Sequence, residues 1–348
     1  MLRAPALRLA LPAYVVSRLL LFLAGWLANA LLGYGRRFDP QYPAAFQTWL
    51  SWDAVHYLRI AQQGYPSWHS SVEVGFFPVL PLVLVAVGAN PVSALIFSVL
   101  AGLAGVVVVV ALTRRLLGDE FAGRTAWVAA FWPTSFVLSA VYTEGLFLAL
   151  AAGALWAAWR GRVVWVLVLG LLAGALRPNG FALAVPLLIL LPGGWRKLAA
   201  LAPAAGMAAF AIFLWVHAGH AVAFAHSQTA NHHLQFGSSP FNLVLAGNPQ
   251  AVVGLLALIA AGLLLWRLQR MPELGRLGRW RWAAVAMVVA LLAPPLAAGT
   301  LVSFGRYAIV AFPLFWAVAS LRVRPLAVVA IPAAAVVTFG AGTGVLTP

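Results

Sequence analysis

The sequence predicts an all-α protein that crosses a membrane many times and forms one multi-pass domain over residues 1–348. Of its 348 residues, 64% are hydrophobic and 8% are charged, which leaves more apolar surface than a water-soluble chain of this size can bury. The apolar residues gather in successive runs of helical length. The net charge of +15 is confined mostly to the short stretches between these runs, as in membrane proteins.

About eleven of the apolar runs are expected to cross the membrane. A further run at 76–88 follows the polar region 33–75. It has only about 13 residues, fewer than the roughly 20 that a crossing needs, so we expect a re-entrant or half-buried helix there. The predicted spans lie at about 11–32, 91–112, 125–142, 145–159, 163–176, 181–192, 199–216, 251–266, 283–302, 306–320 and 325–343.

The basic residues fix the expected orientation. If the run at 76–88 does not cross, alternate loops place most of the 22 basic residues on one side, which the positive-inside rule makes cytoplasmic, together with the N-terminus. The opposite side then receives all seven histidines and the two longest polar loops, at about 33–75 and 217–250. It also receives Asp39, Asp53, Glu73 and Glu144. We therefore expect a protein of the cell (plasma) membrane whose active site is extracytoplasmic.

Several classes of chemistry are excluded or disfavoured by composition. Without cysteine, no disulfide or thiolate site can form. The positive charge is nearly all arginine in short loops, with Lys197 the single lysine, which suits membrane lipid headgroups rather than nucleic acid. No phosphate-binding loop, dinucleotide fingerprint or metalloprotease motif occurs. The histidines of the 217–250 loop lack a metal-ligand spacing, so we predict no metal site and no required cofactor, with a divalent ion as an option.

The stretch Trp49–Tyr65 is the one polar and aromatic helix that the sequence predicts. We expect Ser51 to cap its N-terminus and Gly64 to end it. Asp53 and Tyr57 are four residues apart and share a helix face, with His56 beside them and Trp52 before them. Asp53 is thus a candidate catalytic acid or base; alternatively, it only complements the positive end of the helix dipole.

Three further polar sites interrupt apolar runs on the same side. Glu144 lies between two spans, where an acid usually faces a cavity or a partner, or else is solvated in a tight turn. Arg177-Pro178-Asn179-Gly180 and Arg306-Tyr307 each place an arginine at a span end, either to hold an anion or simply to reach the interface. Two arginines and two carboxylates at membrane depth predict one site, with a lipid-borne phosphate as its ligand.

The motifs, taken in order, resemble the PIG-V family of GPI mannosyltransferase 2 and its bacterial homologues, within the GT-C glycosyltransferases. The similarity extends through most of the chain. It is carried by Trp52-Asp53, His56-Tyr57, Ile60-Ala61, Gly64-Tyr65, Phe76-Phe77-Pro78, Pro81, Leu116–Glu120, Phe131–Phe136, Ser139–Phe147, Arg177–Gly180, Gly305–Tyr307 and Ala311–Phe315. One departure is Ser238, which follows Phe236-Gly237 where bacterial members often have arginine.

The resemblance implies a GT-C-like fold whose extracytoplasmic first loop carries short helices. It also implies transfer of a sugar, most often mannose, from a polyprenyl-phosphate donor to an extracytoplasmic glycan, glycolipid or protein acceptor, with inversion. Asp53 matches the position of the catalytic base, and Glu144 matches a second outer-loop acid. Arg177 and Arg306 are candidate donor-phosphate ligands, and Asn179, Tyr307, Trp52, His56 and Tyr57 are candidate substrate-binding residues.

Two other functions fit the same features. Intramembrane acids, arginines and broken helices also occur in transporters and lipid flippases. However, the sequence shows no convincing internal repeat, and its polar groups gather on one side of the membrane. A non-catalytic assembly partner that kept the scaffold is the third hypothesis, and the retained Asp53 and Glu144 argue against it.

Overall fold

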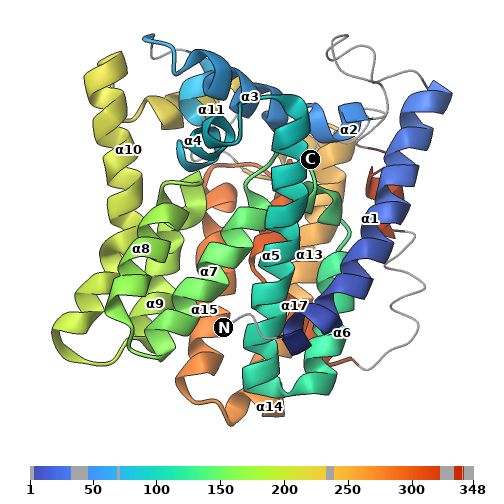
Figure 1. Cartoon of the computed structure of the whole chain (residues 1–348), viewed down its shortest axis with the longest axis vertical. Helices are drawn as coiled ribbons and strands as arrows, with labels where there is room; N and C mark the ends of the chain where they lie inside the picture. The colour runs from blue at the N-terminus through green and yellow to red at the C-terminus, as the bar shows by residue number, and fades with distance from the viewer. Residues whose placement is uncertain are drawn as a thin grey trace.

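The computed structural model describes residues 4–32, 46–68, 71–232, 239–321, 333–338 and 340. All regular elements in these ranges are helical, which confirms the all-α polytopic fold (Figure 1). The α-helices are α1 (Ala4–Leu32), α2 (Gln47–Leu50), α3 (Asp53–Gln63), α4 (Val79–Ala86), α5 (Pro91–Leu117), α6 (Asp119–Ala130), α7 (Glu144–Trp159), α8 (Val163–Gly174), α9 (Ala184–Leu190), α10 (Ala202–Ala218), α11 (Ala223–His232), α12 (Asn242–Leu245), α13 (Pro249–Gln269), α14 (Pro272–Gly275), α15 (Arg279–Ala297), α16 (Phe304–Val310) and α17 (Pro313–Ala319). Short 3-10 helices are η3 (Val72–Gly75), η4 (Ser135–Leu138), η5 (Pro178–Leu183) and η6 (Gly194–Leu201).

Within the described ranges, five helical segments are long and apolar enough to cross a membrane. They are Pro5–Leu31, Pro91–Leu117, Gly194–Ala218, Pro249–Gln269 and Arg279–Ala297. Shorter apolar helices at Glu144–Trp159, Val163–Gly174 and Pro178–Leu190 complete the bundle between them. Most of the run expected at 325–343 falls outside the described residues, so the count of eleven spans stays a prediction.

Two of the expected spans are interrupted helices. The run at 125–142 contains the end of α6, a non-helical break at Pro133 and then η4. The run at 306–320 is divided into α16 and α17, and Pro313 begins the second helix. Proline cannot donate a backbone hydrogen bond and clashes with the preceding turn, so an apolar run that contains it does not have to be one helix.

Arg18, which lies inside the first predicted span, stabilises the non-helical segment after α6. Its guanidinium donates hydrogen bonds to the carbonyl oxygens of Ala130 (3.0 Å) and Ser135 (2.7 Å) and to the Ser139 hydroxyl (2.8 Å). These groups have no water to bind in an apolar bundle, where an unsatisfied carbonyl costs several kcal/mol. The buried arginine of α1 is therefore structural.

Glycines set the spacing of the central helices. A Cβ atom on Gly145 of α7 would lie 2.7 Å from the Cα atom of Gly102 on α5. A Cβ atom on Gly174 of α8 would lie 1.8 Å from the Pro203 carbonyl oxygen of α10. Backbones approach this closely only where a side chain is absent, as is common between membrane helices. The position of Glu144, next to Gly145, follows from the first of these contacts.

Short helices cover one end of the bundle, where α2, α3, α4 and α11 lie together at the top of Figure 1. The α4 helix has eight residues, roughly 12 Å at 1.5 Å per residue, which is too short to cross the hydrocarbon core. Gly64 ends α3 with a φ of +80°, as expected. The expected capping role of Ser51 is wrong: Trp52 occupies the N-cap, and the Ser51 hydroxyl donates instead to the Gln47 carbonyl oxygen.

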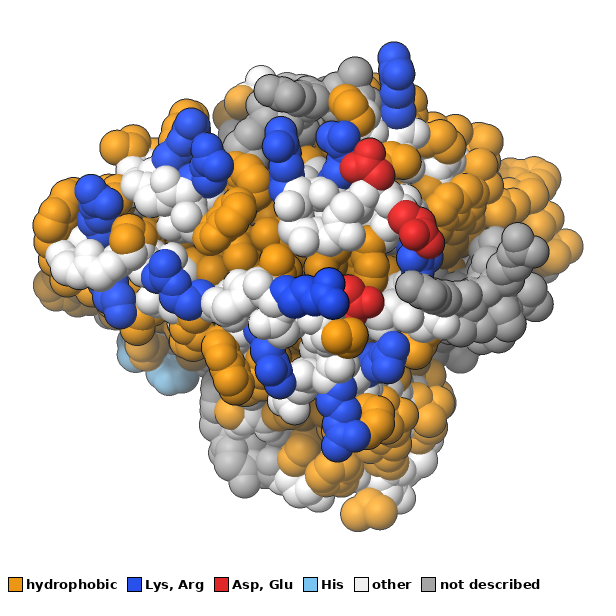
Figure 2. Space-filling view, turned by 90° about the horizontal axis from the view of Figure 1, so that it is seen from below, with side chains coloured by type: hydrophobic (Ala, Val, Ile, Leu, Met, Phe, Trp, Pro, Cys, Tyr) orange, Lys and Arg blue, Asp and Glu red, His pale blue; other side chains and the backbone are white. Residues whose placement is uncertain are grey.

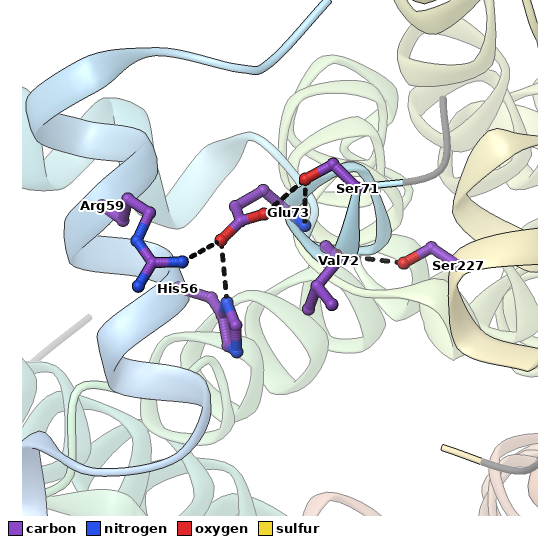
Figure 3. Close-up of polar contacts among 6 residues, drawn as sticks. All are labelled: His56, Arg59, Ser71, Val72, Glu73 and Ser227. Carbon is purple, nitrogen blue, oxygen red and sulfur yellow. Dashed lines mark hydrogen bonds and ion pairs between the residues drawn. The ribbon is translucent and has the colours of Figure 1, made fainter. Parts of the chain in front are cut away.

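A cluster around Glu73 joins α3 to η3 (Figure 3). Glu73 Oε1 accepts from Arg59 of α3 (2.6 Å) and lies 3.1 Å from His56 Nδ1, while Ser71 donates to Oε2. Burial raises the pKa of Glu73, but the hydrogen bonds from Ser71, His56 and Arg59 outweigh it and lower the pKa to about 2. Beside this cluster, Ser227 of α11 donates to the Val72 carbonyl oxygen (3.0 Å), so the two long polar loops are in contact.

The opposite end of the bundle is the basic face. Seen from below, it carries many basic side chains, nearly all of them arginine, and few acidic ones (Figure 2). Contacts between Trp159 and Trp280 and between Arg279 and the Leu191 carbonyl oxygen join the helix ends there. Tryptophans with exposed side chains mark the level at which a chain meets the lipid headgroups. Those near the basic connections are Trp159, Trp165, Trp195, Trp266 and Trp282.

Substituting Gly174 by alanine should destabilise the bundle by about 1–3 kcal/mol, because the added methyl group overlaps the Pro203 carbonyl and forces α8 away from α10. Thermal unfolding in detergent measures the change. Gly262→Ala is the matched control: no atom lies within 4 Å of its added Cβ atom, and alanine is the better helix former. Equal unfolding temperatures for the two variants would contradict the packing argument.

Replacing Glu73 by glutamine should lower the unfolding temperature at pH 7 by a few degrees, because Arg59 loses its anionic partner. The folded-state pKa of about 2 lies below the ordinary value of 4.5. The stability that this carboxylate contributes is therefore complete above about pH 4.5 and lost as the pH falls towards 2. The difference in unfolding temperature between wild type and Glu73→Gln should shrink across that window. The exposed Glu273→Gln serves as the control and should show no such difference.

Candidate active site

Four charged side chains from distant parts of the chain meet at the end of the bundle that α3 covers. They are Asp53 in the first turn of α3, Glu144 in the first turn of α7, Arg177 just before η5, and Arg306 in α16. Each acid begins a helix, where the positive end of the helix dipole favours a carboxylate. The structure therefore brings together the four residues from which the sequence predicted one site.

Arg306 connects the two carboxylates. Its Nη2 atom lies 2.8 Å from Asp53 Oδ2 and 3.0 Å from Glu144 Oε1, and its Nε atom also donates to Glu144 Oε1 at 3.0 Å. Its guanidinium lies over the ring of Tyr142, with Cζ 4.5 Å from the ring centroid. A planar guanidinium can donate in several directions at once, so one arginine can pair with two acids.

Arg177 is the second cation of the cluster and is held more by neutral groups. Its Nη1 atom is 3.5 Å from Glu144 Oε1, and its Nε atom donates to the Asn179 side-chain oxygen at 2.7 Å. Asn179 in turn donates to the Leu291 carbonyl oxygen of α15 (3.1 Å). Arg177 Cζ lies 5.3 Å from the Phe147 ring centroid and 5.6 Å from that of Tyr307. Asn179 and Tyr307 thus position Arg177.

The two acids differ in access. The Asp53 side chain is 23% exposed, and its Oδ1 atom has no described hydrogen-bond partner. The Glu144 side chain is 0% exposed, and its Oε2 atom is buried without a hydrogen-bond partner among the described residues. Of the two carboxylates, Asp53 is the one that an incoming molecule can reach.

The remaining predicted residues lie on α3 or at its N-cap, and Tyr57 is close enough to the charged cluster to interact electrostatically with Asp53 and Glu144. Tyr57 is buried and meets Phe76 edge-on, with ring centroids 5.0 Å apart. His56 stacks on Phe76 (4.8 Å) and faces Glu73, so it belongs to the loop cluster described above. Trp52 has a φ of +60°, which is rare for a bulky residue and is found where surrounding structure enforces it, often at functional sites.

Strained backbone also precedes Arg306, because Ser303 before α16 has a φ of +62°. The Thr134 hydroxyl donates to the Gly305 carbonyl oxygen (3.0 Å), so the break after α6 holds the turn that presents Arg306. Tyr142 and Thr134 were not singled out by the sequence as site residues. Both lie in the motif runs 131–136 and 139–147, which are the signal that could have indicated them.

Metal ligands do not gather in the part of the chain that can be described. Among those residues, no three His, Asp or Glu side chains lie close enough to hold an ion together. Residues 233–238, with His233 and the departure at Ser238, lie outside the described ranges, as do Asp39 and His69.

A comparison with known protein families finds one matching model, described as Mannosyltransferase (PIG-V), over residues 37–218. No curated protein and no solved structure matches the chain. The matched range is just over half of the chain and contains Asp53, Glu144, Arg177 and Asn179, while Arg306 and Tyr307 lie beyond it. Membership of the wider GT-C superfamily stays a prediction. The match and the apolar helices together support a membrane mannosyltransferase, and the chain belongs to the PIG-V mannosyltransferase family.

Proposed function

We propose that this chain transfers a mannosyl residue from a polyprenyl-phosphate donor to an acceptor hydroxyl on the extracytoplasmic side, with inversion at the anomeric carbon. Asp53 is the general base, and Arg306 and Arg177 bind the donor phosphate. The observation that carries the proposal is the convergence of a partly exposed aspartate, a buried glutamate and two arginines at one end of an apolar bundle.

The proposed step is a single displacement. The acceptor oxygen forms a bond to the anomeric carbon of the mannose as the bond from that carbon to the phosphate oxygen breaks. Asp53 Oδ1, the carboxylate oxygen not paired with Arg306, takes the acceptor proton. The lipid phosphate leaves with its negative charge, which the guanidinium groups offset as it develops. Attack opposite the leaving group inverts the configuration.

Arg306 has a second part in this proposal. It is shared between Asp53 and Glu144, so no guanidinium is free of carboxylates before the donor arrives. A donor phosphate adds a third anion to the cluster. We propose that Arg306 keeps the hydrogen bond from Nε to the buried Glu144 and turns its Nη2 atom from Asp53 towards the phosphate. Asp53 is then released for the acceptor hydroxyl, and the base becomes available only when the donor is bound.

The proposed orientation rests on charge. The positive-inside rule supports a cytoplasmic location for the basic face shown in Figure 2, and α3, which carries Asp53, lies at the opposite end of the bundle. The convergence of the two carboxylates and two arginines of the site at this one end also favours a transferase over a transporter, which needs polar access from both sides.

Asp53→Asn should reduce mannosyl transfer by about 10²–10⁴-fold, the usual contribution of a general base, without loss of folding, because the side chain is partly exposed. The assay uses purified protein in lipid with a labelled polyprenyl-phosphate mannose and crude lipid and glycan extracts as acceptors. Asp119→Asn is the matched control, since this exposed residue lies next to the basic face. Near-normal turnover in Asp53→Asn would refute the base assignment.

The Glu144→Gln variant would not give an equally clear test of catalysis, because it removes the buried partner of two arginines and so changes the fold as well.

The same assay tests the donor and the source of positive charge. Because two arginines supply the charge that offsets the phosphate, we expect transfer from the lipid-linked donor to continue in excess EDTA. A labelled nucleotide-mannose should give no product, since it lacks the lipid that carries the phosphate to the site. Transfer from the nucleotide sugar alone would overturn the donor assignment. If EDTA abolished mannosyl transfer and added Mg²⁺ restored it, the proposal that the step needs no metal would be wrong.

A further inference from the structure

The basic face contains a cavity of about 360 Å³ between the N-terminal end of α1 and the C-terminal ends of α5 and α7. Its volume lies within the range of roughly 300–1,000 Å³ that is usual for small-ligand pockets. It is remote from Asp53, at the other end of the bundle. Four arginines and two tryptophans line it: Arg114, Arg115, Arg160, Arg162, Trp156 and Trp159.

The arginines of this cavity are mostly not neutralised. Arg114 forms an ion pair with Asp119 (2.6 Å), but no described carboxylate pairs with Arg115, Arg160 or Arg162. Arg160 lies over the Trp156 ring, with Cζ 6.0 Å from the centroid. In the charged cluster around Asp53, by contrast, each arginine has a carboxylate partner. The cavity therefore holds an excess of positive charge.

The helix dipoles account for the positions of only some of the arginines around the cavity. Arg114 and Arg115 are in the last turn of α5, where a cation complements the negative end of the helix. Arg162 instead occupies the N-cap of the 12-residue helix α8, the positive end, where a further cation is unfavourable. An anion in the cavity would lie beside Arg162 and the other guanidinium groups, and so would offset the repulsion.

Apolar surface leads from the cavity along α5 towards the middle of the bundle. Ala111 lines the cavity, and Leu100, Ala104, Val108 and Arg115 share its helix face at spacings of three and four residues. Leu100 is 58% exposed, Ala104 is also exposed, and Val108 and Ala111 are half-buried. Trp159, exposed beside the cavity, is of the type that lies at headgroup level. A phosphate bound here could therefore carry hydrocarbon chains that follow α5.

We propose that this cavity is a binding site for an anionic phospholipid, with its phosphate on Arg115, Arg160 and Arg162 and an acyl chain along the exposed face of α5. The attached apolar stripe favours a lipid over a free phosphate. This site is separate from the proposed catalytic centre and does not depend on the proposed reaction.

The test is native mass spectrometry of delipidated, detergent-purified protein titrated with dioleoyl-phosphatidylglycerol, with dioleoyl-phosphatidylcholine as the neutral comparison. Wild type should retain phosphatidylglycerol in preference to phosphatidylcholine. Arg115→Gln combined with Arg160→Gln should weaken phosphatidylglycerol binding by roughly tenfold or more, since each arginine near an anionic headgroup contributes on the order of 1 kcal/mol. All replaced side chains are exposed, so the fold should be retained.

A matched control removes the same charge from the same face. Arg270→Gln combined with Arg276→Gln replaces two exposed arginines that do not line the cavity, and it should leave the preference intact. A second variant, Ala111→Leu, reduces the space without changing charge and should weaken binding as well. Equal losses in the cavity and control variants would show diffuse charge attraction and overturn the site. Displacement of the lipid by equimolar inorganic phosphate or glycerol 3-phosphate would overturn the lipid assignment, and unchanged affinity in both cavity variants would overturn the proposal altogether.

Discussion

The architecture of the candidate site depends on one guanidinium group, that of Arg306, which two carboxylates share. Charges in an apolar bundle must be paired, and removing a fully buried partner such as Glu144 costs about 3–5 kcal/mol. Arg306 thus ties α3 to α7 through Asp53 and Glu144, while Thr134 holds the turn that presents it. The break after α6 follows from the same constraint, because its polar backbone lies where the Arg18 side chain can satisfy it.

Much of the fold and part of the site follow from the sequence. Helical class and the grouping of Asp53, Glu144, Arg177 and Arg306 could be predicted because charged residues in an apolar chain have few acceptable surroundings. The bridging role of Arg306 could not, since partner choice depends on how α16 packs against α7. Ser51 failed as a cap because Trp52 adopts a positive φ that local propensity disfavours. The Glu73 cluster was missed because Ser71 and Glu73 lie in a connection without periodicity, and their contact with His56 and Arg59 of α3 depends on how that connection folds back.

The two ends of the bundle differ in how their charge is balanced. At the end beneath α3, acids and arginines are matched, so the proposed donor phosphate would have to compete with carboxylates for a guanidinium. At the basic face, several arginines around a cavity have no described carboxylate, so an anion would bind there without competition. The first arrangement suits a ligand that is bound and released in each turnover, and the second suits one that remains bound.

Lysine is almost absent from this charge pattern, and its one occurrence has a practical consequence. Lys197 lies exposed on η6, in the connection that joins α9 to α10 at the basic face. No other side chain in the sequence is a primary amine. An amine-reactive, membrane-impermeant dye applied to intact cells or to inverted vesicles would label that side chain from one side only. Lys197 is thus a native reporter of which compartment the basic face occupies, without any engineered tag.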